Sequence, residues 1–417
     1  MANAKHKRRV AVIGAGAAGT MAAIFAAEAG GDVTLLERTA DGGRKILLSG
    51  GGHCNVLPSA LDPAQYVTDS SPNTLKKILR SWPLAEQRRF FEETLGVPLL
   101  CEAETGKLFP ASNQARDVRD ALQARARKLG VRFRFDTVVR ELRRADDGAR
   151  WNIQLKDDAI VTADTVVLAT GGLSAAATGC DGSGLRLARA LGHVVHETYP
   201  ALTPLLADPP VHAALAGVSL PVTLSATVAG RRIMSSGAFL FTHKGYSGPA
   251  VLDIAYVAVR AQLRGEAQPI FVQWTSLDET AWEQRLRQSE NVQVATVLRR
   301  ELPARLAATL QTEAGVAADC RLAQLRRDER RTLVEALTRY RLPWTGHEGY
   351  RHAEVTGGGV DLAEVDALTL ESKRQRGLFF CGEMLDAWGP IGGYNFAWAW
   401  TTGRAAGRGA TRSASYK

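Results

Sequence analysis

The chain has 417 residues, of which 45% are hydrophobic and 23% charged. This is the composition of a soluble globular protein with room for two or three domains. A formal net charge of +9 favours acidic partners, such as nucleic acid or a polyanionic cofactor. The 5 cysteines are scattered and lack the spacing of zinc ligands or of a disulfide framework, so we expect a cytoplasmic protein without a metal site.

The apolar segment over residues 10–29 is long enough for a membrane span, yet its pattern is that of a strand, a glycine turn and a helix. Gly14, Gly16 and Gly19 have the G-x-G-x-x-G spacing at which backbone approaches a pyrophosphate and a helix N-terminus offers unpaired N–H groups. A second predicted strand ends at Glu37, whose carboxylate can accept hydrogen bonds from an adenosine ribose. We therefore predict dinucleotide binding and no membrane segment. The predicted residues are Gly14, Ala15, Gly16, Ala17, Ala18, Gly19, Glu37 and Arg38.

Glycines cluster again over residues 42–52, just before His53, Cys54 and Asn55. Such a cluster indicates backbone held close to something flat or phosphorylated, and the basic pair at 44–45 adds charge toward phosphates. A flexible surface loop is the alternative, but it would not place Ile-Leu-Leu between glycines. We therefore predict a wall of the cofactor site, with Gly43, Arg44, Lys45, Ser49, Gly50 and Asn55 as binding residues.

Helical and strand patterns alternate through the next stretch. Residues 63–95 predict an amphipathic helix, residues 115–129 a second helix, and residues 131–142 two strands. Residues 151–164 predict a short antiparallel meander. A buried strand that begins at residue 164 ends in small residues, which lets a nucleotide approach the carboxyl edge of a sheet. The predicted cofactor-binding set therefore includes Ala169, Thr170 and Gly171, and it also includes Val139.

The predicted secondary-structure pattern then changes twice along the chain. Prolines and short β-type runs predict a β-rich insert over residues 199–276, and leucines at helical spacing predict a helical insert over residues 277–345. The α/β pattern returns over residues 346–417, so that residues 1–198 and 346–417 form one dinucleotide-binding domain in two parts. There a strand ends in a Gly-Glu pair, and a glycine pair opens the last helix. The C-terminal binding residues are Gly382, Glu383, Gly392, Gly393, Tyr394 and Asn395.

Together these motifs resemble the two-dinucleotide-binding-domain flavoproteins, and within them the BaiN/RdsA-like family. The resemblance rests on residues 43–55, 245–250, 356–359, 382–395 and 398–400. It implies bound FAD and an α/β fold in which a discontinuous Rossmann-like FAD-binding domain carries an inserted β-barrel-like subdomain and a small helical subdomain. Glu383 replaces the aspartate usual in such flavoproteins, and His53 stands where the family usually has arginine.

The resemblance also implies alkene reduction, with NAD(P)H as a transient electron donor and an electron-poor C=C as the acceptor. The second carbon then needs a proton, and Cys54 is the predicted donor, because its glycine turn is expected to lie on the flavin and a thiol is protonated at neutral pH. The alternative for Cys54 is a small buried packing residue. His53 is the second catalytic candidate, as a proton relay or substrate contact, against an ordinary exposed loop histidine. The next cysteine is Cys101, which is too distant in sequence for the cysteine pair of a flavin disulfide reductase.

Three functions stay open from the sequence. The first is an FAD-dependent reductase of a C=C, whose substrate is a small molecule or, as the positive charge favours, uracil in ribosomal RNA. The second is a flavin reductase or dehydrogenase of a small unsaturated metabolite. The third is a non-catalytic, flavin-bound RNA-binding factor. The sequence assigns no oligomeric state.

Overall fold

The computed structural model describes residues 7–287 and 291–412, and the chain divides into two compact units. Unit 1 is Met1–Thr198 with Val355–Lys417, and unit 2 is Tyr199–Glu354. Each unit encloses its own hydrophobic core. No helix in the described part of the chain is long and apolar enough to cross a membrane.

Unit 1 is organised around a five-stranded parallel sheet with the order β20-β10-β1-β2-β6. Val, Ile, Leu and Phe fill most of the central strands, because helices bury both faces of such a sheet. All four pairings are parallel, so the carboxyl ends of the strands meet at one edge. The strands are β1 (Arg9–Ile13), β2 (Asp32–Leu36), β6 (Arg132–Arg134), β10 (Thr165–Leu168) and β20 (Leu378–Phe380).

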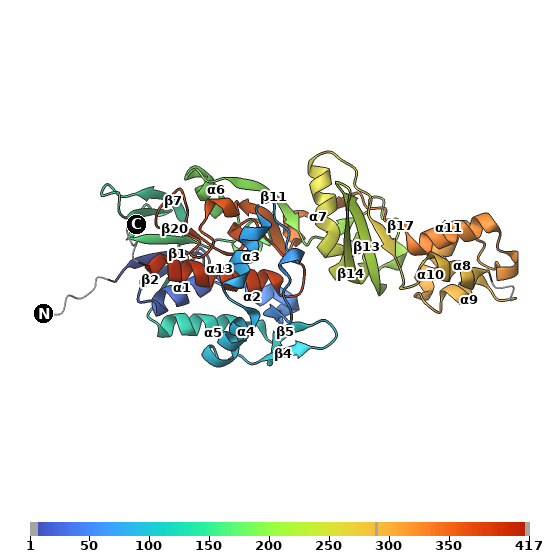
Figure 1. Ribbon diagram of the computed structural model, residues 1–417, viewed down its shortest axis with the longest axis horizontal. Coiled ribbons are helices and arrows are strands. Elements are labelled where there is room, and N and C mark those ends of the chain that lie inside the picture. The colour runs from blue at the N-terminus through green and yellow to red at the C-terminus, as the bar shows by residue number, and fades with distance from the viewer. Residues whose placement is uncertain (1–6, 288–290, 413–417) are drawn as a thin grey trace. The chain divides into compact units, whose positions relative to one another are not determined.

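Two helices from opposite ends of the chain lie side by side against this sheet, α1 (Ala17–Glu28) and α13 (Tyr394–Thr411) (Figure 1). A Cβ at Gly403 would lie 2.4 Å from the carbonyl oxygen of Ala18, and one at Gly407 would lie 2.2 Å from that of Ala22. The two backbones therefore touch. Because both contacts advance in the same chain direction, the helices are parallel, and both N-termini lie at the carboxyl edge of the sheet.

The prediction of one helix over residues 63–95 is wrong. The segment forms a short 3-10 turn (Pro63–Gln65), α3 (Pro72–Arg80) and α4 (Leu84–Arg89), and α4 continues directly into a π-helical turn (Phe90–Thr94). Pro72 and Pro83 stand at the two helix starts, where proline is favoured, and a proline inside a continuous helix would break it.

Smaller elements complete unit 1. The predicted antiparallel meander consists of β7 (Val139–Arg144), β8 (Trp151–Leu155) and β9 (Ile160–Ala163). A second small sheet has β3 (Leu57–Pro58), β4 (Leu99–Glu102) and β5 (Lys107–Pro110), and the helices are α2 (Arg44–Leu48), α5 (Ala115–Lys128) and α6 (Ser183–Ala190). β11 (Val195–Ala201) carries the chain out of unit 1, and β19 (Val355–Val360) carries it back.

Unit 2 contains a seven-stranded antiparallel sheet with the order β17-β16-β13-β14-β15-β12-β18. Its long hairpin joins β13 (Ser219–Val228) to β14 (Arg231–Phe241). The other strands are β12 (Leu205–Leu206), β15 (Gly245–Ser247), β16 (Phe271–Gln273), β17 (Tyr340–Arg341) and β18 (Gly346–His347). The helical segment that follows has α8 (Glu279–Leu286), α9 (Val294–Leu298), α10 (Ala304–Glu313) and α11 (Arg327–Thr338), and α12 (Gly349–His352) precedes the return to unit 1.

One helix of unit 2 was not expected from the sequence. α7 (Pro249–Leu263) lies along β13 and β14 (Figure 1). Its Val251, Ile254 and Ala258 are buried in the core of unit 2. Its many β-branched residues lower intrinsic helix propensity. Burial against the sheet outweighs that preference, since a helix needs only one apolar side to pack.

Four polar side chains of unit 2 are joined by hydrogen bonds, and we call His212, Tyr246, Glu313 and Tyr340 the His212 network. His212 and Tyr246 are buried, whereas the Glu313 side chain is 36% exposed. His212 Nδ1 lies 2.9 Å from Tyr246 Oη, and its Nε2 lies 3.0 Å from Glu313 Oε1 and 3.1 Å from Tyr340 Oη. Burial raises the pKa of both tyrosines. Their hydroxyls therefore stay neutral and act as hydrogen-bonding groups.

Candidate functional site

The first glycine turn has the geometry of a phosphate-binding turn. A Cβ at Gly14 would lie 2.5 Å from the Ala169 carbonyl oxygen, and one at Gly19 would lie 1.8 Å from that of Gly14, so the packing itself requires both glycines. At Gly16, a Cβ would meet no described atom within 4 Å. The middle glycine therefore leaves open space at the N-terminus of α1, where a pyrophosphate can approach the backbone.

Glu37 lies at the carboxyl end of β2, next to this turn. One carboxylate oxygen accepts a hydrogen bond from Ala15 N at 2.6 Å, and the other accepts from Thr39 N and Oγ1 at 2.8 and 2.7 Å. The carboxylate is buried and firmly oriented. It occupies the place in the fold where an acidic side chain receives ribose hydroxyls.

The neighbours of Glu37 have different tasks. Arg38 pairs with Asp181 at 2.7 Å. Burial by itself would raise the pKa of Asp181, but hydrogen bonds from Arg38 and Ser183 lower it to about 2. Val139 is half-buried at the start of β7, two residues after Thr137, whose N–H donates to the Glu37 carbonyl at 2.8 Å. The charge of Arg38 is thus paired with Asp181. Val139 lies near the carboxyl end of β2.

Four polar side chains from separate segments form what we call the Glu383 network. Lys45 Nζ donates to Glu383 Oε2 at 2.6 Å and to Ser174 Oγ at 3.0 Å. Glu383 Oε1 accepts from Ser174 Oγ at 2.8 Å and from Thr356 N at 2.9 Å. Burial alone would raise the pKa of Glu383, but the Lys45 ammonium and the hydrogen bonds from Thr356 and Ser174 outweigh it and lower that pKa. The cluster therefore holds a fixed ion pair at the end of β20.

Sequence reasoning found Lys45 and Glu383 but missed Ser174 and Thr356. The signals in the sequence were the positions of these two residues beside glycine runs, Ser174 after Gly171-Gly172 and Thr356 before Gly357, and the place of Thr356 in the 356–359 motif of the family resemblance. Hydroxyl side chains in such places are common in loops without a ligand. Their convergence on one carboxylate becomes visible only when the segments are folded together.

The second glycine cluster forms a tight loop after α2. Its start is joined to the first turn, because Gly43 N donates to the Ala15 carbonyl at 2.9 Å. Gly50, Gly51 and Gly52 have φ angles of 57°, 66° and 95°, the left-handed region that glycine adopts at no steric cost. The predicted Arg44 pairs with Asp41 at 2.8 Å, and Ser49 Oγ donates to the Ile46 carbonyl at 2.7 Å.

The two catalytic candidates in this loop are placed differently. Cys54 is completely buried, and this burial raises the pKa of its thiol to about 12 against the opposing hydrogen bond with Ser49. His53 is exposed, and its Nδ1 lies 2.9 Å from the Asn113 carbonyl oxygen. A carbonyl only accepts, so Nδ1 carries the proton, and neutral His53 has a bare Nε2.

Two asparagines fix the backbone that leads into α13. The Asn55 amide accepts from Gly393 N at 3.0 Å and donates to the Leu57 carbonyl at 3.1 Å. The Asn395 amide exchanges two hydrogen bonds with the Gly389 backbone, at 2.9 and 2.8 Å. The Tyr394 carbonyl accepts from Tyr66 Oη at 2.8 Å. The second glycine loop and the N-terminus of α13 are therefore held together, with Gly392 and Gly393 between them.

The remaining predicted residues line the same edge of the sheet. Ala169 N donates to the Ile13 carbonyl at 2.9 Å, so Ala169, Thr170 and Gly171 directly follow the end of β10. The backbone of Gly382, after β20, donates to Thr402 Oγ1 and accepts from Trp398 Nε1 at 2.9 and 3.0 Å. α13 thus fixes the Gly382 peptide groups beside the Glu383 network.

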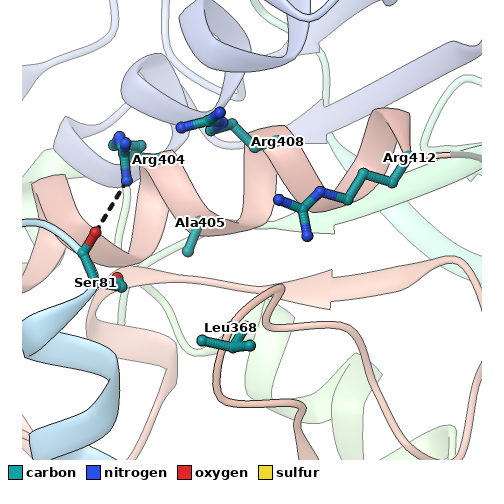
Figure 2. A pocket seen from close by; sticks show the side chains of 6 residues that line it. All are labelled: Ser81, Leu368, Arg404, Ala405, Arg408 and Arg412. Carbon is teal, nitrogen blue, oxygen red and sulfur yellow. Dashed lines mark hydrogen bonds between the residues drawn. The ribbon is translucent and has the colours of Figure 1, made fainter.

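A cavity of about 280 Å³ lies farther along α13 and is distinct from this site (Figure 2). Arg404, Arg408 and Arg412, four residues apart on one side of the helix, line it with Ser81, Leu368 and Ala405. Arg404 donates to the Ser81 carbonyl at 3.1 Å and lies over the Trp82 ring at 5.2 Å. None of the predicted cofactor-binding residues contributes to the cavity.

The residues at the carboxyl edge fit a dinucleotide such as FAD. Two parallel helix N-termini offer backbone N–H groups for anions, Gly16 leaves room for phosphates, and Glu37 suits a ribose. Across residues 7–287 and 291–412, no group of three or more His, Cys, Asp or Glu side chains is arranged to hold a metal ion.

The sequence matches the family described as "HI0933-like protein Rossmann domain" over residues 8–409. The chain belongs to this HI0933-like family. It is 33% identical over 409 residues to a ribosomal RNA dihydrouridine synthase of Escherichia coli, covering 94% of this chain and 95% of that protein. It is 31% identical to a 3-dehydro-bile acid delta(4,6)-reductase of Clostridium scindens, covering 96% and 98%.

Solved structures share the fold of this HI0933-like chain. A 3-ketosteroid delta1-dehydrogenase from Sterolibacterium denitrificans aligns with a TM-score of 0.51 and 13% identity, over 96% of this chain and 99% of that one. An open flavocytochrome c3 fumarate reductase aligns with a TM-score of 0.50 and 17% identity, over 98% and 78%. With the family match, these results confirm the predicted family, the α/β fold class and the expectation of an oxidoreductase.

Proposed function

We propose that the protein is an FAD-dependent oxidoreductase that reduces an electron-poor C=C, and that its substrate is uracil in ribosomal RNA. The main support is the convergence of the Gly16 turn, the α13 N-terminus and the Glu383 network at one edge of the parallel sheet. This arrangement combines two anion sites with an ordered ion pair, as a charged dinucleotide with a polar ring system requires.

FAD, when bound, supplies a hydride acceptor and donor, and NAD(P)H is the proposed source of electrons. The chain's own task is to bind and orient. The turn at Gly16 would receive the pyrophosphate, Glu37 the adenosine ribose, and Gly382 with Glu383 the ribityl chain. The N-terminus of α13 would stabilise negative charge on the ring system through the positive end of its dipole.

Cys54 remains our proposed proton donor, with His53 as the second candidate. The Cys54 thiol keeps its proton at neutral pH because burial raises its pKa to about 12, so it would release that proton only to a strongly basic carbanion. His53 would donate from Nε2 only as an imidazolium, because Nδ1–H is committed to Asn113.

Variants of the two side chains test this assignment. Cys54→Ala is expected to retain bound FAD and its reduction by NAD(P)H but to lose product formation, whereas His53→Gln is expected to keep most turnover. Stopped-flow reduction and product analysis separate the two half-reactions. Full turnover by Cys54→Ala would remove Cys54 as the donor.

Two observations support RNA as the substrate. The chain carries a net charge of +9, which suits a polyanion. It also matches ribosomal RNA dihydrouridine synthases of two bacteria at 33% identity over 94% of its length. A small unsaturated metabolite is the second candidate, favoured by the 31% match to the bile acid reductase.

The decisive experiment is anaerobic. The flavin of the purified protein is reduced with NADH or NADPH, unmodified ribosomal RNA is added, and flavin reoxidation is followed together with dihydrouridine by mass spectrometry. Reoxidation matched by dihydrouridine is the expected result. Reoxidation by unsaturated ketones but not by RNA or partly assembled ribosomal particles would instead favour the metabolite. A flavin that neither NADH nor NADPH reduces would point to a non-catalytic RNA-binding factor.

A further inference from the structure

One face of the seven-stranded sheet in unit 2 is not covered by the core. α7 lies along β13 and β14 on one side of the sheet (Figure 1). Along β13, Val222, Leu224 and Ala226 are buried, and the residues between them point to the opposite face. The strand register shows which side chains share that face. Ser225 lies opposite Met234 of β14 and opposite Phe271 of β16. We call this side of β14, β13, β16 and β17 the open face.

Three arginines stand on or beside the open face. Arg341 is opposite Phe271 in the register, Arg232 is opposite Thr227, and Arg339 precedes β17. All three are exposed, and within residues 7–287 and 291–412 none of them forms a side-chain ion pair. Other arginines of unit 2 are neutralised, such as Arg264 by Glu266. The open-face arginines thus present uncompensated positive charge.

The composition of the sheet reinforces this charge. The seven strands of unit 2, all within the described residues, contain no Asp or Glu. Between the arginines stand small hydroxyl side chains, such as Thr223 and Ser236, whose oxygens are 3.0 Å apart. The surface of short polar side chains is flat and spans about 14 Å from β14 to β17, so an extended single strand of nucleic acid can lie across it. A globular protein partner would instead need an apolar patch at the centre of the interface.

The face also offers a stacking position. The Arg339 guanidinium lies over the Phe271 ring, with Cζ 4.6 Å from the ring centroid. Met234, in the same row as Phe271, is 56% exposed. Planar guanidinium groups, aromatic rings and polarisable methionine side chains are surfaces on which unstacked bases settle. Positive charge and a stacking position together are the combination that single-stranded nucleic acid requires.

We propose that the open face binds single-stranded RNA, with phosphates at Arg232 and Arg341 and a base against the Arg339–Phe271 pair. This inference rests on the proposed reduction of ribosomal RNA, because it assigns a docking surface to that substrate. In a double helix the bases are stacked and paired, so their planar faces could not contact the side chains of the sheet. A single-stranded segment is therefore the form of RNA that this surface fits.

Fluorescence anisotropy of a labelled RNA of about 12 nucleotides, titrated with the full-length flavoprotein at several salt concentrations, tests the proposal. Arg232→Gln/Arg341→Gln is expected to weaken binding at least tenfold. It should also reduce the slope of log affinity against log salt by about 1.4, the value for two lost phosphate contacts to a single strand. Phe271→Leu should weaken binding about fivefold or more with an unchanged salt slope, as expected for lost stacking.

The matched control is Arg299→Gln/Arg300→Gln, which removes the same charge from two exposed positions outside the sheet. This variant should bind like the wild type. Equal weakening by both double variants would overturn the proposal in favour of net charge alone. Displacement of RNA by polyglutamate at an equal concentration of charge would also overturn it, because the face would then accept any polyanion.

Dihydrouridine formation by the same variants separates this inference from the proposed function. A raised KM for RNA with unchanged kcat in Arg232→Gln/Arg341→Gln supports both. Variant-sensitive RNA binding without any dihydrouridine in the wild type would leave the surface standing and reject the function. Unchanged binding and unchanged KM in the double variant would reject the surface and leave the function standing.

Discussion

Unit 1 and unit 2 each contain a cluster of four polar side chains, and the two clusters differ in what surrounds them. The Glu383 network joins segments at the glycine-lined edge of a parallel sheet, and its lysine and glutamate side chains remain 26% and 17% exposed. The His212 network lies among aromatic rings, with Phe241 5.7 Å from the His212 ring. The Glu383 network is thus a partly accessible ion pair at a glycine-lined edge, whereas the His212 network has a buried histidine at its centre, 4% exposed, and reaches solvent through Glu313, which is 36% exposed.

This difference indicates different tasks. An ion pair that stays partly accessible can contact a bound ligand. The free-energy cost of removing its charges from water is also reduced, because water still reaches them. A network with a buried histidine and a buried neutral tyrosine at its centre, and with its carboxylate at the surface, fixes the arrangement of strands and helices. We therefore expect perturbation of the Glu383 network to affect both flavin binding and stability, and perturbation of the His212 network to affect stability alone.

The largest effect is expected from Lys45→Met. Its loss leaves Glu383 without its cation in a largely buried place, which should reduce the free energy of unfolding by about 3 kcal/mol and lower the flavin content of the purified protein. The measurements are denaturant unfolding and the ratio of flavin to protein absorbance. The double variant Lys45→Met/Glu383→Gln should recover most of the stability but not the flavin. A fully additive loss in the double variant would contradict the pairing.

His212→Phe comes next. The Tyr246 hydroxyl and the Glu313 carboxylate lose a partner, which should cost about 1–3 kcal/mol while the flavin content stays unchanged. His243→Phe, at an exposed position of the same unit, is the control and should leave the unfolding free energy within about 0.5 kcal/mol of the wild type. If His212→Phe lost flavin at a temperature where the protein stays folded, the His212 network would not affect stability alone, and the proposed difference between the two networks would be wrong.

A smaller effect is expected on the pH dependence of stability. Burial alone would raise the pKa of Glu313, but its hydrogen bonds with His212 and Tyr340 lower that pKa below its ordinary value. The resulting stabilisation is therefore fully present above the unfolded-state pKa of about 4.3 and disappears as the pH falls through the lower folded-state value. Urea unfolding from pH 7 to pH 3 should show Glu313→Gln less stable than the wild type at neutral pH, with the two converging in acid. A constant difference across this range would contradict the assignment.

Gly16→Ala should have the smallest effect on stability. The position has φ −78°, which alanine adopts freely, and its Cβ would point into open space, so the unfolding free energy without flavin should stay within about 0.5 kcal/mol of the wild type. Flavin affinity should nevertheless fall, because the methyl group would occupy the approach of the pyrophosphate. Gly19→Ala is the contrasting variant and should destabilise the apoprotein strongly, since its Cβ would lie 1.8 Å from a carbonyl oxygen. Unchanged flavin affinity in Gly16→Ala would place the phosphates elsewhere.

The sequence by itself determined the features that depend on neighbouring residues. The spacing of Gly14, Gly16 and Gly19 defines a strand–turn–helix because close backbone contact at this turn admits only glycine. The short β-type runs within residues 199–276 likewise predict strands, and the structure has β13 and β14 there. These are local rules of sterics and periodicity, and they identified the dinucleotide-binding turn, the meander and the helical segment of unit 2.

Only the tertiary structure decided which distant groups meet. Ser174 and Thr356 join Lys45 on the Glu383 carboxylate because strand order and helix packing bring four segments together. The parallel contact of α1 with α13, the helix α7 and the open face likewise depend on which surfaces are buried against each other. Propensity and spacing carry no information on such long-range contacts, since the burial energy that selects them belongs to the assembled core.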